Sequence, residues 1–556
     1  MSGHRRHFVT VAGRQVHMRW AGSGPPVVLL HACPKSSVEQ APLVERLSRR
    51  FTAFAFDIPG YGDSEPLPLP RPEIADFADA FAATLETLGI GRAAAYGRHT
   101  GGLIVLDLAQ RHRGRLSRII LDGFPVFTEA ERQRFLTGYL QPLLPLWDGL
   151  HLPGLWARLR ENYLFFPWNE GPLPENRNPI DMPPAEQMHA TAVDMLKVMD
   201  LWRLGYAAAF RYRPQAALAA LDCPALIMAR RDDLLHPHLE RLPPLPANVA
   251  VEAHSHDVAA WADRIEGFLA DADPLPAAPR PAATRPRPDR PWSEIVDTPT
   301  GPVRLRHAGA GQKRLMLLHD LPGSGMVELP LMRHLADVAR VTIPDLPGVG
   351  LSAALPEGAG QADLLDTLET LWRREGCNVL ASRGLTSGLA LALAARHGST
   401  HPLALIRPCF PPAGDTDGFA AAHAPDIPPC DAGTHLTRLW TIARDNELYF
   451  PWFTPRREAI RAGLRPLDPE RLTAQVVAMA ENPAGYRRLV LAAVDPSGGS
   501  PAPHPGRALL VADPDRIGHD LADRAAGILP AASRETVVLP TVETEAAALR
   551  PWLSGL

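Results

Sequence analysis

The stretch AAYGRHTGGL, residues 94–103, joins a short apolar run to a glycine-rich segment. Small and aromatic residues lead into it as in a buried strand, and an apolar helical pattern follows. Gly97 and Gly101 flank the central residue, His99, and allow close packing on both sides of a tight turn. The stretch therefore predicts a strand, a glycine-rich turn that contains His99, and a helix.

Two further segments of the chain occur twice. Residues 31–64 align without a gap to residues 319–352, and both end in the pattern Asp-x-Pro-Gly-x-Gly-x-Ser. Residues 155–168, LWARLRENYLFFPW, match residues 439–452, LWTIARDNELYFPW. The repeats predict two copies of one fold, and 556 residues are enough for two cores of about 250 residues each.

A proline-rich segment separates the two copies. Residues 271–291, DADPLPAAPRPAATRPRPDRP, alternate proline with alanine and arginine, a composition that favours extended chain over a packed core. We therefore expect a first domain over residues 1–270, a linker over 271–291 and a second domain over 292–556. We also expect intramolecular contact between the two domains.

Each copy alternates short apolar runs with amphipathic stretches. The runs, such as PPVVLLHA, FTAFAFD and PALIMAR in the first copy, are typical of buried parallel strands joined by helices. Between the fourth and fifth runs lies an aromatic, proline-rich insertion, about residues 127–215 in the first copy. The fold class predicted is α/β, with a mostly parallel sheet flanked by helices and a helical cap insertion in each domain.

Composition limits the class of partner. The formal net charge of −4 lacks the basic excess that nucleic-acid binding requires. The five cysteines form no CxxC pair, which argues against disulfides and zinc and favours a reducing compartment. Neither a signal peptide's apolar segment nor an apolar run of about 18 residues occurs. We expect a cytoplasmic protein with a small-molecule partner and with neither a nucleic-acid nor a membrane partner.

The order of motifs in the first copy resembles the α/β-hydrolase superfamily. LLHACP resembles that family's His-Gly loop, FDIPGYGDS its Pro-Gly turn, and YGRHTGGL its G-x-S-x-G nucleophile elbow. PALIMARRDDLLHP resembles the late strand that ends at the catalytic acid, and VAVEAHSHD the last strand with its histidine loop. The resemblance implies two tandem α/β-hydrolase-fold domains, over residues 7–270 and, more weakly, 292–556.

The resemblance also implies roles for residues of the first domain. His99 stands where the family has its nucleophilic serine, at a positive φ that histidine tolerates better than most residues. The backbone N–H groups of Cys33 and Thr100 correspond to the two oxyanion-hole donors. The Cys33 thiol is a conceivable nucleophile, but nothing in the sequence indicates a lowered thiol pKa.

The acid and the base each have alternatives. Asp233 precedes a proline by four residues, as the family's acid commonly does, and is preferred to Asp232, with Asp122 as the next candidate. His256 is preferred to His254 as the base because it lies farther into the loop after the last strand. The predicted catalytic group therefore consists of the histidine at the elbow, Asp233 and His256.

A histidine at the elbow changes the expected chemistry. His99 and His256 would form an acid–base pair oriented by Asp233, beside two oxyanion donors. We expect cofactor-independent hydrolysis of a small organic molecule without a bound metal. The alternatives are an acyl-histidine intermediate, a lyase, cyclase or decarboxylase reaction, a metal site formed by the two histidines and the aspartate, and a pseudohydrolase that only binds a ligand or partner.

The cap and the second copy complete the expectations. Phe165, Phe166 and Trp168 are predicted to contact an apolar substrate, although their motif also recurs in the second copy, which favours packing. In the second copy Leu385 aligns with His99, and the segment after the last strand has no histidine. Asp513 or Asp515 would take the acid position of the second copy, which we expect to be catalytically silent.

Overall fold

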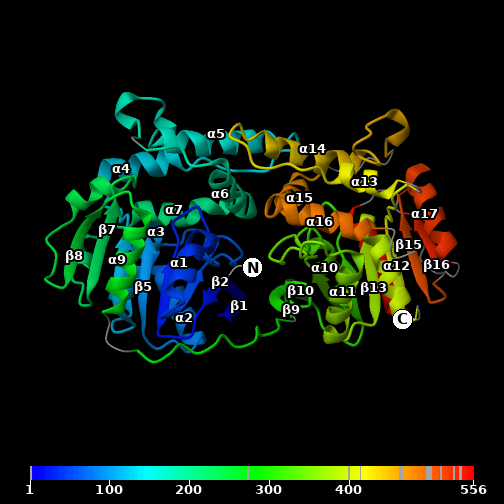
Figure 1. The fold of residues 1–556 in the computed structure, drawn as a ribbon, viewed down its shortest axis with the longest axis horizontal. Coiled ribbons are helices and arrows are strands. Elements are labelled where there is room, and N and C mark those ends of the chain that lie inside the picture. Colours follow the sequence, from blue (N-terminus) through cyan, green and yellow to red (C-terminus); the bar gives the residue numbers. More distant parts are fainter. Residues whose placement is uncertain are drawn as a thin grey trace. The chain divides into compact units, whose positions relative to one another are not determined.

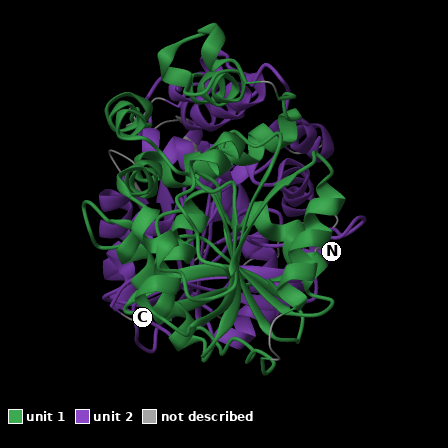
Figure 2. Ribbon diagram, turned by 90° about the vertical axis from the view of Figure 1, so that its left-hand side faces the viewer, with its two compact units in different colours: residues 1–144, 154–285 green, residues 145–153, 286–556 purple. Residues whose placement is uncertain are grey.

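The computed structural model forms two compact units (Figure 2). Unit 1 comprises residues 1–144 and 154–285, and unit 2 comprises residues 145–153 and 286–556. The structure describes residues 3–178, 180–271, 275–287, 289–398, 401–412, 415–461, 467–495, 504–513, 516–529, 532–536 and 541–556.

Unit 1 is built around one eight-stranded sheet (Figure 1). Strands β1, β2 and β4 pair antiparallel, and all later pairs are parallel. In spatial order the strands are β1 (Arg5–Val11), β2 (Arg14–Ala21), β4 (Thr52–Phe56), β3 (Pro26–Leu30), β5 (Ala93–Arg98), β6 (Leu116–Asp122), β7 (Ala225–Arg230) and β8 (Val249–His254).

Unit 2 repeats this strand order in a second eight-stranded sheet. Its first two strands again pair antiparallel with their neighbours, and the remaining pairs are parallel. In the same spatial order the strands are β9 (Trp292–Thr298), β10 (Gly301–Ala308), β12 (Arg340–Pro344), β11 (Arg314–Leu318), β13 (Val379–Arg383), β14 (Leu403–Ile406), β15 (Ala508–Ala512) and β16 (Ala532–Thr536).

The central strands form because their side chains are apolar on both faces. Every residue of β3 and β4 is buried, as continuous runs such as PVVLL and TAFAF require. Apolar side chains of α1 and α9 join those of β3 and β4 in one core cluster, and α10 and α18 do the same in unit 2. The helices around the sheets are α1 (Ala41–Leu47), α2 (Ile74–Thr87), α3 (Thr100–Arg111), α8 (Gln215–Ala219) and α9 (Val258–Ala270) in unit 1, and α10 (Leu329–Leu335), α11 (Gln361–Glu375), α12 (Ser387–Arg396), α17 (Arg516–Ile528) and α18 (Val542–Ser554) in unit 2.

Each sheet carries a helical insertion before its last two strands. The helices of the insertions are α4 (Glu129–Arg134), α5 (His151–Leu164), α6 (Ala185–Val198) and α7 (Trp202–Arg211) in the first, and α13 (Thr416–His423), α14 (Thr434–Leu448), α15 (Pro469–Ala480) and α16 (Pro483–Val494) in the second. Within the described residues, all helices are too short or too polar to cross a lipid bilayer.

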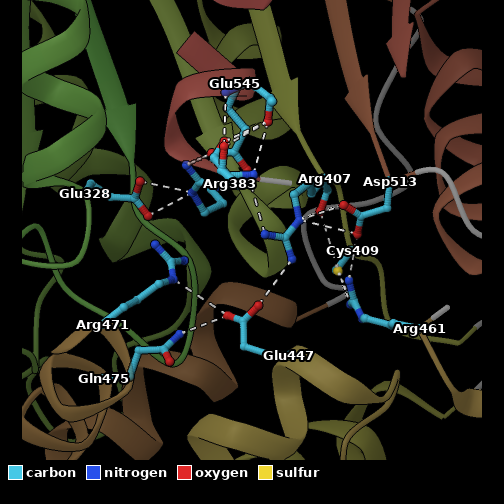
Figure 3. Close-up of polar contacts among 12 residues, drawn as sticks. Glu328, Arg383, Arg407, Cys409, Glu447, Arg461, Arg471, Gln475, Asp513 and Glu545 are labelled. Atoms are coloured by element: carbon cyan, nitrogen blue, oxygen red, sulfur yellow. Dashed lines mark hydrogen bonds and ion pairs between the residues drawn. The ribbon is translucent and has the colours of Figure 1, made fainter. Parts of the chain in front are cut away.

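A buried arginine ties three elements of unit 2 together. Arg383, at the end of β13, bonds Glu545 of α18 through two nitrogen atoms, at 2.6 Å each (Figure 3). Its Nε lies 2.9 Å from Glu328, which directly precedes α10. All three side chains are almost fully excluded from solvent, so each charge depends on its partners for stabilisation.

Replacing Arg383 with alanine would leave two glutamates buried without their main partner. We expect the Arg383→Ala variant to lose about 3–5 kcal/mol of stability in unit 2, measured by chemical unfolding. Arg373→Ala, which removes an exposed ion pair with Glu369, is the matched control and should change stability little. Equal losses in the two variants would contradict the importance of the buried network.

Candidate functional site

His99 occupies the turn between β5 and α3. Its backbone has a φ of 49° and a ψ of −113°, and its N–H donates to the Asp122 carbonyl oxygen at 2.9 Å. A Cβ atom on Gly97 would overlap the backbone of Gly101, and one on Gly101 would lie 2.5 Å from the Leu30 carbonyl oxygen. The two glycines therefore let α3 start in direct contact with β3 and β5, which holds His99 at the carboxyl end of the sheet.

The imidazole of His99 is bonded to Asp233, which follows β7. Nε2 lies 2.9 Å from Oδ2 and 3.0 Å from Oδ1 of this carboxyl group. Asp233 also accepts from the Arg98 guanidinium at 3.0 Å and from the Leu235 N–H at 2.9 Å. Burial raises the pKa of Asp233, but these partners outweigh it and hold the pKa well below its usual range. Asp233 is therefore ionised at neutral pH and fixes the ring.

The second ring nitrogen of His99, Nδ1, is available for chemistry. Among the described residues no hydrogen-bond partner of Nδ1 is present, and the His99 side chain is 25% exposed. Because an ionised carboxylate only accepts hydrogen bonds, a neutral His99 carries its proton on Nε2. The lone pair of Nδ1 is then free, and the His99–Asp233 pair presents a base at the elbow.

The backbone N–H groups of Cys33 and Thr100 lie in the two loops that meet at the elbow. Cys33 is in the loop after β3, and Thr100 is the first residue of α3. Within the described part of the chain, neither N–H donates to another residue. Burial raises the pKa of the Cys33 thiol to about 12, despite hydrogen bonds with Tyr61 and Thr100. The thiol is therefore protonated and is excluded as the nucleophile.

Glu39 links the loop after β3 to the acid. Its Oε2 accepts from the Ala32 N–H at 2.9 Å, and its Oε1 accepts from Lys35 Nζ at 2.8 Å. Burial raises the pKa of Glu39, but Lys35 and Arg98 lower it to about 2. Arg98 lies 3.6 Å from Glu39 and also bonds Asp233. It therefore bridges the two carboxylates.

Sequence reasoning did not identify Arg98 or Glu39. Arg98 directly precedes the elbow residue. A charged residue at the end of a buried strand could have indicated that it belongs to the site. Glu39 lies in the short 3-10 helix Ser37–Gln40, and its role depends on the packing of this helix against Arg98. No short motif could indicate it.

His256 does not join the other two predicted residues. Its side chain is 69% exposed, and its Nδ1 lies 3.8 Å from Asp232. The edge strand β8 is largely exposed, and Asp257 begins α9 by accepting from the N–H groups of Ala259 and Ala260. The loop therefore ends directly after His256, on the outside of the sheet. This corrects the predicted group of three, because His99 and Asp233 meet without His256.

The side chains of the other candidate acids and of the other candidate base contact residues other than His99. Asp122 is buried and accepts from the Tyr96 hydroxyl at 2.6 Å, and burial raises its pKa. Asp232 is bonded by the guanidinium of Arg230 at 2.7 Å and 3.0 Å. His254 lies beside a glutamate of its own strand, at 3.4 Å. Of these candidates, Asp233 is the one that bonds the elbow histidine.

The aromatic residues predicted to contact substrate pack within the cap. The Phe166 ring centroid lies 5.7 Å from that of Phe135 and 5.9 Å from that of Tyr139. Trp168 lies 6.5 Å from Tyr139, and a guanidinium lies 5.7 Å from the ring of Phe165. These contacts explain Phe166 and Trp168 as packed against the apolar core of the cap, whereas Phe165 contacts a guanidinium. Contact of the three residues with a substrate stays a prediction.

The corresponding turn of unit 2 carries a glycine. The strand registers place Gly384, with a φ of 58°, at the position of His99, and Leu385 at the position of Thr100. This corrects by one residue the alignment of Leu385 with His99. The Thr386 hydroxyl lies against the carbonyl oxygens that end β11, where unit 1 has a glycine.

The acid position of unit 2 is engaged by arginines. Asp513 lies 3.1 Å from Arg407 Nε and 3.2 Å from Arg461 NH1 (Figure 3). The other candidate, Asp515, lies outside the described residues. Because Gly384 has no side chain, the described part of unit 2 contains no counterpart of the imidazole–carboxylate pair.

Groups of atoms with metal-ligand spacing lie away from the elbow. Two such groups occur among the described residues, and neither includes His99 or Asp233. In each, the members bond one another: His17 Nδ1 lies 2.7 Å from Asp57, and His307 Nε2 lies 3.2 Å from Glu294. The contacts explain these groups as buried histidine–carboxylate hydrogen bonds.

The sequence of unit 1 matches a known family. Residues 25–248, from β3 to just before β8, match the family model described as alpha/beta hydrolase fold. The matched segment includes the elbow, the acid Asp233 and the whole cap insertion.

Curated relatives include hydrolases of more than one kind. A soluble epoxide hydrolase of Corynebacterium sp. (strain C12) is 32% identical over 125 residues, which are 22% of this chain and 43% of that protein. A 2-(acetamidomethylene)succinate hydrolase of Mesorhizobium japonicum is 31% identical over 129 residues, 22% of this chain and 46% of that protein. The chain therefore spans less than half the length of these relatives.

Among solved structures, epoxide hydrolase A of Mycobacterium thermoresistibile is 18% identical, with a TM-score of 0.39, and the match covers 49% of this chain and all of that one. The family match rests on residues 25–248, and the strand order of unit 1 recurs without change in unit 2. The chain is therefore an α/β-hydrolase-fold protein with two α/β-hydrolase-like domains.

Proposed function

We propose that unit 1 is a cofactor-independent hydrolase of a small, apolar molecule, with His99 as the general base for an attacking water. The observation that carries this proposal is the bond between His99 Nε2 and Asp233 at the elbow. This bond leaves Nδ1 free, and the N–H groups of Cys33 and Thr100 belong to the loop after β3 and to the first turn of α3, which directly follows His99. A base, an orienting carboxylate and two oxyanion donors are the parts that water attack on a carbonyl needs.

The proposed reaction proceeds in two steps. Nδ1 of His99 removes a proton from water while the water oxygen attacks the carbonyl carbon, and the carbonyl electron pair moves onto its oxygen. The N–H groups of Cys33 and Thr100 bind that oxygen, and Asp233 stabilises the imidazolium. When the tetrahedral intermediate collapses, the leaving group takes the proton from Nδ1. A carboxylic acid and an alcohol or amine are released.

Arg98 and Glu39 act as positioning residues in this proposal. Arg98 keeps Asp233 ionised and in place through its bond at 3.0 Å. Glu39 holds the loop that contains Cys33 by accepting from the Ala32 N–H. The bridge through Arg98 therefore sets the position of the acid relative to the oxyanion donors.

The same base supports a second reaction class. Nδ1 of His99 can remove a C–H proton beside a carbonyl group, with the enolate oxygen bound by the two N–H donors. The observation that favours this candidate is the imidazole at the elbow, where a hydrolase that forms an ester intermediate needs a hydroxyl. In the activity test, a lyase substrate would then take the place of the ester. A pseudohydrolase would bind such a compound without converting it.

An apolar substrate is proposed from the surroundings of the acid. Leu235, whose N–H bonds Asp233, belongs to an apolar cluster with Phe127, Phe135 and Phe210. Because the side chains beside the acid are apolar, we infer that a substrate bound at His99 from this side is apolar too. Because relatives include hydrolases named for an epoxide and for an acetamidomethylene succinate, the panel of test compounds includes epoxides and amides as well as esters.

Removal of the elbow imidazole tests the proposed base. We expect His99→Ala to lower kcat/KM for aryl and alkyl esters at least about 100-fold, because the water loses its proton acceptor. Asp233→Asn should also lose activity, because its side chain no longer selects the productive tautomer. His256→Ala is the matched control and should retain activity. The measurement is initial rates over the panel, with and without a chelator.

Each deviating result has a definite meaning. An equal loss in His256→Ala would contradict the two-residue site and support the predicted group of three. Loss of wild-type activity on chelation would support a metal site. Absence of turnover of all compounds by the wild type would contradict hydrolysis and favour the lyase or the pseudohydrolase.

The lowered pKa of Asp233 predicts a pH-dependent contribution to stability. Since its pKa is lower in the folded than in the unfolded chain, the contribution is complete above the unfolded pKa of about 4 and is lost as pH falls below it. The melting temperature of the wild type should exceed that of Asp233→Asn at pH 7, and the difference should narrow below about pH 4. Asp232→Asn is the sequence-adjacent control and should follow the wild type. If the difference in melting temperature between the wild type and Asp233→Asn stays constant from pH 3 to pH 7, the lowered pKa of Asp233 is contradicted.

A further inference from the structure

Two backbone N–H groups at the elbow of unit 2 share one acceptor. The counterparts of the Cys33 and Thr100 N–H groups belong to Leu321 and Leu385. Both donate to Oδ1 of Asp320, at 2.7 Å and 2.8 Å. Two backbone amides therefore converge on one carboxyl oxygen, which is the geometry that an oxyanion hole presents to a substrate.

Asp320 occupies space that a side chain at the elbow would need. A Cβ atom on Gly384 would overlap the carboxyl group of Asp320. Unit 1 has Ala32 at the position of Asp320 and His99 at the position of Gly384. A carboxyl group in the loop and a side chain at the elbow therefore exclude each other.

Arg407 takes up further space at the same site. In unit 1 its position belongs to Gly123, and a Cβ atom there would lie 2.5 Å from the His99 ring. Arg407 pairs with Asp513 at 3.1 Å and with Glu447 at 3.6 Å (Figure 3). The region that holds the imidazole in unit 1 is therefore filled in unit 2 by a buried ionic network.

We propose that the amide pair of unit 2 is a carboxylate-binding site whose permanent occupant is the side chain of Asp320. Unit 2 keeps the geometry of an oxyanion hole, and its own carboxyl group closes that hole to substrate. When the Asp320 side chain is removed, the amide pair becomes a site for a small monocarboxylate such as formate. This inference concerns unit 2 alone and does not depend on the activity proposed for unit 1.

The test replaces Asp320 with alanine, the residue that unit 1 has at this position. In the full chain, Asp320→Ala leaves two buried N–H groups without an acceptor and should lower the melting temperature of unit 2 by about 5 °C or more. The unfolding transition of unit 2 is identified as the one whose melting temperature Arg383→Ala also lowers. Sodium formate should restore the lost stability in a saturable manner, because it binds the folded variant.

Two controls separate formate binding from general salt effects. Sodium chloride at equal ionic strength should not restore Asp320→Ala, and formate should not stabilise the wild type. Asp320→Asn retains an acceptor for both N–H groups and should melt near the wild type without a formate response. Line broadening of ¹³C-formate by Asp320→Ala but not by the wild type should report the binding directly.

Several outcomes would overturn the proposal. Asp320→Ala could be as stable as the wild type. Its stability could respond equally to formate and to chloride, or it could leave the ¹³C-formate signal unbroadened. If Asp320→Ala is insoluble, refolding in formate should recover soluble protein, and failure to recover it counts against the proposal. Activity of unit 1 should be unchanged throughout, because Asp320 lies in the other unit.

A double-mutant cycle provides an independent test. Gly384→Ala should destabilise the wild type, because its Cβ overlaps Asp320 and its φ is positive. The strain from φ is the same in both backgrounds, so it cancels in the cycle. Gly384→Ala should therefore cost less in the Asp320→Ala background. Additive effects would contradict the mutual exclusion of the two side chains.

Discussion

The close packing of the elbow on the first central strand is the constraint on which both units depend. In unit 1, Gly97 and Gly101 allow α3 to start against β3, so the residue between them takes a positive φ at the carboxyl edge of the sheet. The loops after β3, β5 and β7 open at this edge because these strands are parallel. The strand order therefore places His99, Asp233 and the loop that contains Cys33 at one edge of the sheet.

The sequence was sufficient to predict the central strands of both sheets, and two of the three candidate residues, His99 and Asp233, bond each other in the structure. Continuous apolar runs identify strands that are buried on both faces, and Asp233 lies shortly after one of them, β7. The edge hairpin β1–β2 was not predicted, because its strands mix polar and apolar residues without a continuous run. His256 follows the exposed edge strand β8, where a motif gives the position along the chain and not the direction of the side chain.

The parts that were missed depend on contacts between distant segments. Arg98 ends strand β5 and Glu39 lies in the 3-10 helix after β3, and no local pattern marks such a pair. The elbow of unit 2 was misaligned by one residue because Thr386 was matched to Thr100. In the structure Thr386 takes the place of Gly101, and its hydroxyl bonds the carbonyl oxygens against which that glycine packs. Residues of the two units are therefore equivalent when they share a backbone position, not when they are of the same type.

The two units place different sets of side chains on the same backbone fold. Unit 1 combines Ala32, His99 and Gly123, and unit 2 has Asp320, Gly384 and Arg407 at the same three positions. A Cβ atom at Gly123 would clash with the imidazole, and one at Gly384 would clash with the carboxyl group. The small and large residues therefore depend on one another, and a single exchange between the units would create an overlap or a cavity. An imidazole at the elbow and a carboxyl group on the two backbone amides are mutually exclusive for this reason. One backbone therefore holds a histidine–aspartate pair in unit 1 and, in unit 2, the carboxyl group that we propose closes the amide pair.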